Sequence, residues 1–548
     1  MMTTTEWLQA EKQSSTGAGR PIPRFLLKCL VLMCFFALAL FLQYLSGADR
    51  SEFSAYPDEP AHYVTSLMVR EYITGPVPHH PVRFAEQYYQ HYPKVALGHW
   101  PPVFYIIQAI WMILFTGLRI SVRAEIAFTT AALAFSVWSE ARRWFDNHSA
   151  KWAPMLAGVL LICLPLVQNA TDQEMAEALL TLFCFWSTVY FGRYLASEKT
   201  SDILWFALYF SLAVLTKGSG WMLAILPPLA LLLTRKLRLL LRPSFWLGPL
   251  LIAVLCLPWQ VVTIKSAARG WTGGTTPSFA YTGMALVRFA LIVIDMVGLV
   301  LSILMFLGIF VTVLLPFVRR PVRYVPAVMF GLIVSDWLFH SLVPAGVEDR
   351  KMILAVPAVI YFVFTGASWL ADRIRLGEKL QPWRRSIVGG IAGLSFAATV
   401  FAVPHIKHYG YDEAARYLLA NGDAHLGTIL ISSESGGEGW LISELAMRDP
   451  RPKMVVLRAT KELAVVDWNG RQYRSLFSTP NQLLAYTDRR GIRLLVLDDY
   501  PAQLPFSHQR LIQQTIASYP NRFHLLKSFS EPSAAKGEID IYQVVPPK

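Results

Sequence analysis

Long apolar runs alternate with short basic connectors over most of the chain, from Phe25 to Val403. A helix needs about 20 mainly apolar residues to cross a bilayer. Runs that approach or reach this length predict eleven membrane-spanning helices, at residues 25–45, 124–141, 152–169, 175–192, 203–216, 219–233, 244–264, 289–316, 324–343, 352–370 and 386–404. The pattern therefore predicts a polytopic α-helical membrane protein.

The pattern changes after residue 404, where no apolar run is long enough to cross a bilayer. Short apolar runs alternate there with segments of helical spacing, which favours a small, mostly parallel sheet covered on both faces. The expected helices are Tyr411–Ala420, Gly437–Met447 and Asn481–Arg489, and the expected strands are Thr428–Ser432, Lys453–Leu457, Arg493–Leu497 and Ile539–Val545. We expect residues 405–548 to form a C-terminal α/β domain.

The composition is that of a lipid-embedded chain. Of its 548 residues, 54% are hydrophobic and 16% are charged, and the mean hydropathy is +0.39. Such apolar content excludes a disordered protein. The net charge of +13 could suggest a nucleic-acid binder. However, residues 1–404 hold 33 of the 50 basic residues and 22 of the 37 acidic ones, so most of the excess lies in membrane connectors.

Basic residues also predict the orientation, because cytoplasmic loops are enriched in Lys and Arg. Cations around the start of the first span predict a cytoplasmic tail over residues 1–24: Lys12, Arg20, Arg24 and Lys28. The basic connectors are all cytoplasmic if the eleven runs are the only crossings. Residues 101–118 would break this parity, so we interpret them as a helix that enters the outer interface and returns, with an ordinary span as the alternative. The transmembrane domain then covers residues 25–404, and its outer loop 47–123 and the C-terminal domain are extracytoplasmic.

Two adjacent carboxylates, Asp58 and Glu59, follow the first span on the predicted outer side. One interpretation is structural, with Asp58 capping a helix over residues 59–73. The other is a general base that takes a proton from an acceptor hydroxyl or amine. Composition alone does not decide between them.

Further motifs follow in a defined order. They are Gly98–Tyr105 (GHWPPVFY), Met175–Leu180 (MAEALL), Leu215–Gly218 (LTKG) and Arg350–Leu354 (RKMIL). Together with Asp58-Glu59 they resemble the motifs of polyprenyl-phosphate-sugar-dependent glycosyltransferases of the GT-C fold class. That group includes the protein O-mannosyltransferases, the lipid A aminoarabinose transferase and lipopolysaccharide-core galacturonosyltransferases. Leu-Thr-Lys-Gly is the closest match, whereas Trp100 interrupts the family's His-Pro-Pro stretch.

The resemblance covers about residues 20–370 and implies a GT-C fold, about eleven transmembrane helices and additional interfacial helices. It implies that the chain moves a sugar from a polyprenyl-phosphate-linked donor to a lipid, glycan or protein on the outer face of the membrane. Asp58 would be the catalytic base, with Glu59 beside it. Direct displacement of the lipid phosphate would invert the configuration at the sugar carbon. No nucleotide-binding motif is found, which suits a donor already activated in the membrane.

The charged residues of the other motifs are expected to hold the donor. Lys217, Arg350 and His99 are the candidate phosphate-binding residues, because they would counter the charge of the departing polyprenyl phosphate. Glu177 and, less strongly, Asp172 form the second acidic motif, in which Glu177 would hold a divalent metal ion or orient Asp58. Lys217 and Glu177 each have a structural alternative. Lys217 could be a lysine that snorkels to the membrane interface, and Glu177 could be a glutamate whose hydrogen bonds are made at the start of a helix.

Two other functions stay open. A flippase or transporter of lipid-linked glycans would favour charges within spans and repeat-like halves, but only Asp295 and Asp336 are obvious mid-span acids and no internal repeat is visible. A polymer ligase would use the same donor side. The resemblance also implies the inner membrane of a bacterium, a role in the cell envelope and lipopolysaccharide, and no nucleic-acid partner.

Overall fold

The computed structural model describes residues 23–547, except for short segments within that range. These segments are 54–55, 76–79, 97, 145–151, 272–276, 376, 378, 401–408, 421–426, 435, 450–453, 467–472, 500–503, 505 and 531–536. The predicted cytoplasmic tail therefore lies outside the described residues up to residue 22. The predicted domain boundary at 404–405 also lies outside them.

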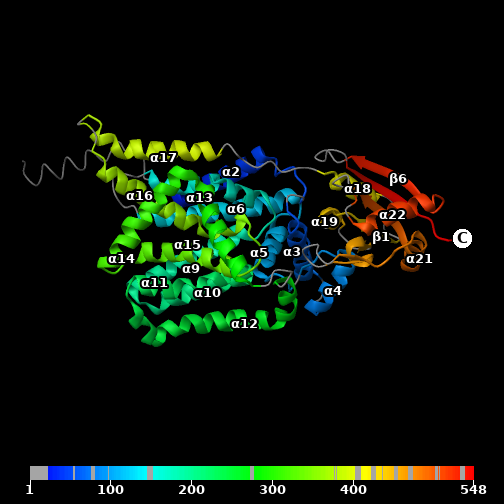
Figure 1. The fold of residues 1–548 in the computed structure, drawn as a ribbon, viewed down its shortest axis with the longest axis horizontal. Coiled ribbons are helices and arrows are strands. Elements are labelled where there is room, and N and C mark those ends of the chain that lie inside the picture. The colour runs from blue at the N-terminus through cyan, green and yellow to red at the C-terminus, as the bar shows by residue number, and fades with distance from the viewer. Residues whose placement is uncertain are drawn as a thin grey trace, which may run out of the picture.

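A bundle of long helices makes up the larger part of the molecule (Figure 1). It consists of α2 (Arg24–Ser46), α6 (Arg119–Trp144), α7 (Ala153–Cys163), α8 (Pro165–Asp172), α9 (Glu177–Ser197), α10 (Thr200–Thr216), η2 (Gly218–Ala224), α11 (Leu226–Leu233), α12 (Pro243–Trp271), α13 (Phe279–Ile309), α14 (Leu315–Arg319), α15 (Tyr324–Leu342), η5 (Asp349–Ala355), α16 (Val356–Arg373) and α17 (Arg384–Val400). Within the described residues, each predicted span coincides with one of these helices or with consecutive ones. The span 289–316 covers most of α13, the π-helix η4 (Phe310–Leu314) and the start of α14.

Among the described residues, six helices are long and apolar enough to cross a membrane. The pair α7–α8, bent by 58°, raises this number to at most seven, and α10 and the η2–α11 pair are apolar but shorter. The predicted class of polytopic membrane protein is confirmed. The count of eleven crossings stays a prediction.

Three shorter helices come from the loop that follows α2. They are α3 (Glu59–Thr74), α4 (Pro81–His91) and α5 (Val103–Leu114). The 12 residues of α5 rise about 18 Å at 1.5 Å per residue, which is short of the roughly 30 Å hydrocarbon core. The interpretation of residues 101–118 as a helix that does not cross stays a prediction, because α10 and the η2–α11 pair are also shorter than the helices that meet the length for crossing.

Two glycines let α13 and α16 approach each other closely. A side chain on Gly308 would clash with the carbonyl oxygen of Phe362, and one on Gly366 would clash with that of Leu304. Small residues at such contacts are typical of helix pairs in membranes, where backbone packing replaces the hydrophobic effect as the source of stability. The contact fixes α16 and, with it, the η5 turn at its start.

The C-terminal region folds as a five-stranded sheet with strand order β2-β1-β5-β7-β6. The strands are β1 (Thr428–Ser432), β2 (Val455–Arg458), β5 (Ile492–Asp498), β6 (Phe523–Ser530) and β7 (Glu538–Val544), and a separate pair is formed by β3 (Ala464–Val465) and β4 (Arg474–Ser475). The helices are α18 (Tyr411–Ala420), α19 (Gly437–Arg448), α20 (Ala459–Glu462), α21 (Pro480–Arg490) and α22 (Ser507–Ser518). The sheet is covered on both faces, because Ile429 and Ile431 belong to one buried cluster and Leu430 between them to another.

The prediction of a mostly parallel sheet is only partly right. β1 is parallel to β2 and to β5, but β7 is antiparallel to both β5 and β6. β6 and α22 were missing from the predicted elements. The seven residues that join β6 to β7 are too few for the crossover that a parallel pair requires, so these two strands form an antiparallel hairpin.

The C-terminal sheet region packs on α3 and α4, which belong to the loop after α2 (Figure 1). Side chains of both parts share one apolar cluster, which includes Tyr63 of α3 and Leu441 of α19. The Tyr92 hydroxyl donates to Asp449 at 2.7 Å, and the buried Glu52 carboxylate accepts from the backbone of Asp412 at 2.8 Å. The sheet domain is thereby fixed at the end of the bundle where α3 begins.

Candidate active site

Asp58 lies at the start of α3, where Pro60 in the first turn favours helix initiation. Its backbone carbonyl accepts from the amides of Ala61 and His62, both at 3.0 Å, but its side chain makes no capping hydrogen bond. The carboxylate instead lies 3.5 Å from Nη2 of Arg350 and is 16% exposed. The structural interpretation of Asp58 as a side-chain cap is therefore not realised, and the carboxylate faces a cation.

Arg350 connects most of this cluster. Its Nη1 lies 3.3 Å from Glu177, its Nη2 donates to the Tyr56 hydroxyl at 2.9 Å, and its Nε donates to Glu348 at 2.5 Å. The guanidinium also lies 4.0 Å from the centre of the Tyr56 ring, within the range of a cation–π contact. The arginine is held by groups from three separate parts of the chain.

Lys217 ends α10 in an extended conformation. Its Nζ donates to Glu177 at 2.6 Å, and the two side chains are 18% and 6% exposed. The following turn is tight, because a side chain on Gly220 would clash with the backbone of Ala213. Lys217 therefore points into the protein and ion-pairs there, which is not the geometry of a snorkelling lysine.

Glu59 faces away from Asp58 and belongs to a second, buried cluster. Its carboxylate lies 3.5 Å from Arg123 and accepts from the amides of Tyr56 at 3.1 Å and Glu174 at 2.7 Å. Asp172 lies in the same region, where its backbone carbonyl accepts from Arg123. The structure therefore brings together Asp58, Glu177, Lys217 and Arg350, but it separates Glu59 and Asp172 from them.

We expect Glu59→Gln to lower the free energy of unfolding by about 3–5 kcal/mol, because it leaves the buried Arg123 without its ion pair. Thermal unfolding of the purified protein measures this loss. The matched control is Glu71→Gln in the same helix, whose pair with Arg70 is 21–27% exposed and is worth at most about 1 kcal/mol. Equal stability of the two variants would contradict the structural role of Glu59.

An aromatic wall flanks Asp58. The rings of His62 and Trp100 lie 4.5 Å apart, and His99 contacts Trp100 edge-on at 4.6 Å. Burial lowers the pKa of His62 to about 3, with a smaller effect in the same direction from Lys217. Burial also lowers the pKa of His99, and the charge of Asp58 partly offsets this. Both imidazoles are therefore neutral near pH 7, so His99 would approach a phosphate as a hydrogen-bond donor and not as a cation.

Several residues of this cluster were not among the predicted site residues. Tyr56 and Glu348 hold Arg350, and the Tyr56 hydroxyl donates to Glu348 at 2.9 Å. Lys94 packs against Gly439 of the C-terminal domain, and its charge faces Asp58, Glu438 and Glu434. Tyr56 and Glu348 each lie two residues before a predicted site residue, Asp58 and Arg350, and this proximity was the available signal in the sequence. The contacts of Lys94 join distant parts of the chain and gave no such signal.

A divalent metal ion at Glu177 does not fit these contacts. Oε1 of Glu177 lies 2.6 Å from Nζ of Lys217 and 3.3 Å from Nη1 of Arg350. Two positive charges this close to the carboxylate disfavour the binding of a metal cation there. Within the described parts of the chain, no group of three or more His, Cys, Asp or Glu residues is arranged to hold a metal ion. We therefore derive no step through a metal at this carboxylate.

Comparisons with known proteins bear on the same region. A sequence family described as dolichyl-phosphate-mannose-protein mannosyltransferase matches residues 99–261, which include His99, Glu177 and Lys217. No curated protein matches the chain significantly by sequence.

Solved structures with the same fold match nearly the whole chain. ArnT from Cupriavidus metallidurans bound to undecaprenyl phosphate is 14% identical, with a TM-score of 0.53 over 93% of this chain and 97% of that one. The apo state of ArnT gives 12% identity and a TM-score of 0.57 over the same shares. The archaeal oligosaccharyltransferase AglB from Archaeoglobus fulgidus, in complex with an inhibitory peptide and a dolichol-phosphate, is 12% identical, with a TM-score of 0.54 over 95% of this chain and 74% of that one.

The predicted resemblance is confirmed. The chain has the GT-C fold, and the family match agrees with the predicted class of enzyme, a membrane glycosyltransferase. The fold covers the C-terminal domain as well, since the match to ArnT extends over 93% of the chain. The roles of the individual site residues stay predictions.

Proposed function

We propose that this protein transfers a sugar from a polyprenyl-phosphate-linked donor to an acceptor at the outer face of the membrane. The observation that carries the proposal is the cluster in which Asp58, Glu177, Lys217 and Arg350 meet, although they lie far apart in the sequence. The lipid phosphates in the solved structures of ArnT and AglB support a lipid-linked donor.

In the proposed reaction Asp58 accepts a proton from the acceptor hydroxyl or amine as that atom attacks the sugar carbon. A new bond forms between the acceptor atom and the carbon, and the bond from the carbon to the phosphate oxygen breaks. The electron pair of that bond leaves with the polyprenyl phosphate, and the configuration at the carbon inverts. Arg350 and Lys217 stabilise the charge that develops on the leaving phosphate, and His99 donates a hydrogen bond.

Both cations are paired with carboxylates, which sets a condition on donor binding. Lys217 contacts Glu177 at 2.6 Å, and Arg350 contacts Glu348 at 2.5 Å. A phosphate that approaches these cations would have to share them with Glu177 and Glu348. Glu177 is therefore a positioning residue, which keeps Lys217 and Arg350 close together until the donor arrives.

The outer location of the site follows from the predicted orientation and needs its own test. A reporter that is active only outside the cytoplasm is expected to be active when it is fused after Ala420, because α18 belongs to the domain that packs on the predicted outer loop. A fusion at Leu118, after α5, should give the same result. A cytoplasmic signal at Ala420 would contradict the assigned face, and one at Leu118 alone would show that α5 crosses the membrane.

The acceptor and the membrane follow from the resemblance. We propose a bacterial inner membrane and an acceptor in the cell envelope, either a lipopolysaccharide precursor, another lipid-linked glycan or a protein. The C-terminal domain lies beside the site through Lys94 and Gly439, so it is positioned to contact the acceptor.

The proposal is tested by incubating the purified protein with radiolabelled polyprenyl-phosphate sugars and membrane extract, followed by identification of the labelled product. We expect label to move from the lipid to an acceptor, and nucleotide sugars to be inactive as donors. Transfer from nucleotide sugars alone would contradict the proposed donor. A polymer ligase, the closest alternative, would transfer a chain of sugars from the same side.

A further inference from the structure

A cavity of about 610 Å³ lies between α6, α7, α14, α16 and α17. It is lined by Trp144 at the end of α6, Arg320 and Arg323 between α14 and α15, and Trp369 and Asp372 near the end of α16. α16 begins beside Arg350 and ends at this cavity, so the cavity lies at the end of the bundle away from the candidate active site (Figure 1). The cavity lies at the end of the bundle where the basic connectors between the helices lie.

The cavity is positively charged. Three arginines line it, Arg320, Arg323 and Arg385, against one carboxylate, Asp372. Asp372 is already paired with Arg385 at 2.9 Å and with Arg384 at 3.6 Å. Arg320 and Arg323 have no carboxylate partner among the residues that the structure describes. Two arginine charges therefore face the cavity without compensation.

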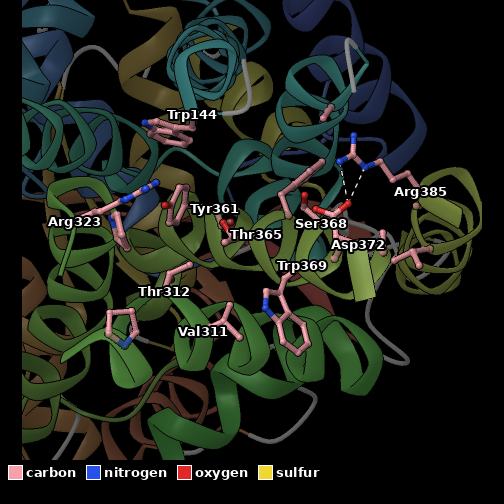
Figure 2. Close-up of a pocket in the computed structure, with 18 of the residues that line it drawn as sticks. Trp144, Val311, Thr312, Arg323, Tyr361, Thr365, Ser368, Trp369, Asp372 and Arg385 are labelled. Atoms are coloured by element: carbon pink, nitrogen blue, oxygen red, sulfur yellow. Dashed lines mark hydrogen bonds and ion pairs between the residues drawn. The ribbon is translucent and has the colours of Figure 1, made fainter. Parts of the chain in front are cut away.

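Most of the remaining lining is aromatic and apolar, interrupted by the hydroxyls of Thr312, Thr365 and Ser368. The indoles of Trp144, Trp152 and Trp369 border the cavity, and Tyr361 packs edge-on against Trp144 at 5.1 Å. Figure 2 shows Arg323 beside Trp144 and Tyr361, with Val311 and Trp369 lower in the view. Tryptophan is enriched at the depth of lipid headgroups, where its ring contacts both acyl chains and polar groups. The lining therefore combines two arginine charges with aromatic and apolar groups, which is the chemistry that an anionic phospholipid requires.

We propose that this cavity binds an anionic phospholipid of the membrane leaflet opposite the active site. The phosphate would lie between Arg320 and Arg323, and the first carbons of the acyl chains would lie against the tryptophans. The volume falls within the range of about 300–1,000 Å³ that is typical of small-ligand sites. Basic pockets between membrane helices on the cytoplasmic side bind anionic headgroups by the same attraction. The inference does not depend on the proposed sugar transfer.

Native mass spectrometry measures this binding. The full-length protein is incubated in detergent with equimolar phosphatidylglycerol and phosphatidylcholine and is then released from the detergent in the spectrometer. We expect the wild-type protein to retain phosphatidylglycerol preferentially. R320Q/R323Q should weaken that binding about 30-fold, since each cation near an anionic headgroup contributes about fivefold. R142Q/R143Q, which changes two exposed arginines at the same end of the bundle outside the cavity, is the matched control and should bind as the wild type does.

Two further variants separate loss of binding from loss of folding. Ser368→Trp narrows the cavity from an exposed position on α16 without changing its charge, and it should also weaken phosphatidylglycerol binding. Asp372→Asn removes the carboxylate of the lining and should strengthen it. Equal retention of the two lipids, unchanged binding in both R320Q/R323Q and S368W, or displacement of the lipid by millimolar inorganic phosphate would overturn the proposal. The last of these results would identify the cavity as a site for free phosphate.

Discussion

Replacing Asp58 with asparagine is expected to reduce sugar transfer by about 100- to 10,000-fold, the usual effect of losing a general base. The change removes the proton acceptor but keeps the size of the side chain. The fold should survive, because the Asp58 side chain makes no capping hydrogen bond and its contact with Arg350 is 3.5 Å long. Initial rates with a lipid-linked donor measure the loss, and thermal unfolding tests the fold.

Asp49→Asn is the matched control, because Asp49 lies in the same loop and also pairs with an arginine, Arg50, at 3.5 Å. It should leave the rate unchanged. Near-wild-type turnover in Asp58→Asn would contradict the assignment. If Glu59→Gln then lost activity without losing stability, the base would be Glu59.

Lys217→Ala is expected to reduce transfer by about 100- to 1,000-fold, the range seen when one donor to a developing negative charge is removed. The loss should appear in the dependence of the rate on donor concentration, because Lys217 is proposed to contact the donor phosphate. Lys217→Arg should restore activity only in part, since the planar guanidinium cannot reproduce the point charge of the ammonium beside Glu177.

Lys236→Ala is the matched control, because Lys236 makes an equivalent ion pair with Glu198, at 2.8 Å, away from the site. Loss of an ion pair alone should therefore give similar changes in stability for both variants, but a loss of rate only for Lys217→Ala. If Lys217→Ala leaves the donor dependence unchanged, Lys217 is an anchor and Arg350 becomes the stronger candidate for the phosphate.

The helical bundle could be predicted from the sequence, because a long apolar run by itself indicates a helix that is surrounded by lipid. The number of crossings could not be settled in this way, since α10 and the η2–α11 pair are shorter than a membrane is thick. In the C-terminal domain, the buried strand β5 was recognisable from its apolar residues. β6 was missed because only Phe523 of its eight residues is buried, so it lacks a clear two-residue alternation.

The candidate site was predictable where a short motif carries its own chemistry. Asp58, Lys217 and Arg350 were proposed as site residues from such motifs. The structure brings them together around Glu177 and Tyr56, and their roles stay predictions. The separation of Asp58 from Glu59 was not predictable, because it depends on Arg123 in another helix. The contact of Arg350 with Tyr56 was equally hidden, since these residues lie almost 300 positions apart in the sequence and meet only in the fold.

The most direct test of the proposed reaction uses a polyprenyl-phosphate sugar with one radiolabel in the sugar and another in the phosphate. The purified protein is incubated with this donor and membrane extract, and the two labels are followed separately. Glycosyl transfer predicts that the sugar label moves to the acceptor while the phosphate label stays on the lipid, and that Asp58→Asn prevents this separation. Joint transfer of both labels, or movement of the intact donor across the membrane without any separation, would contradict it.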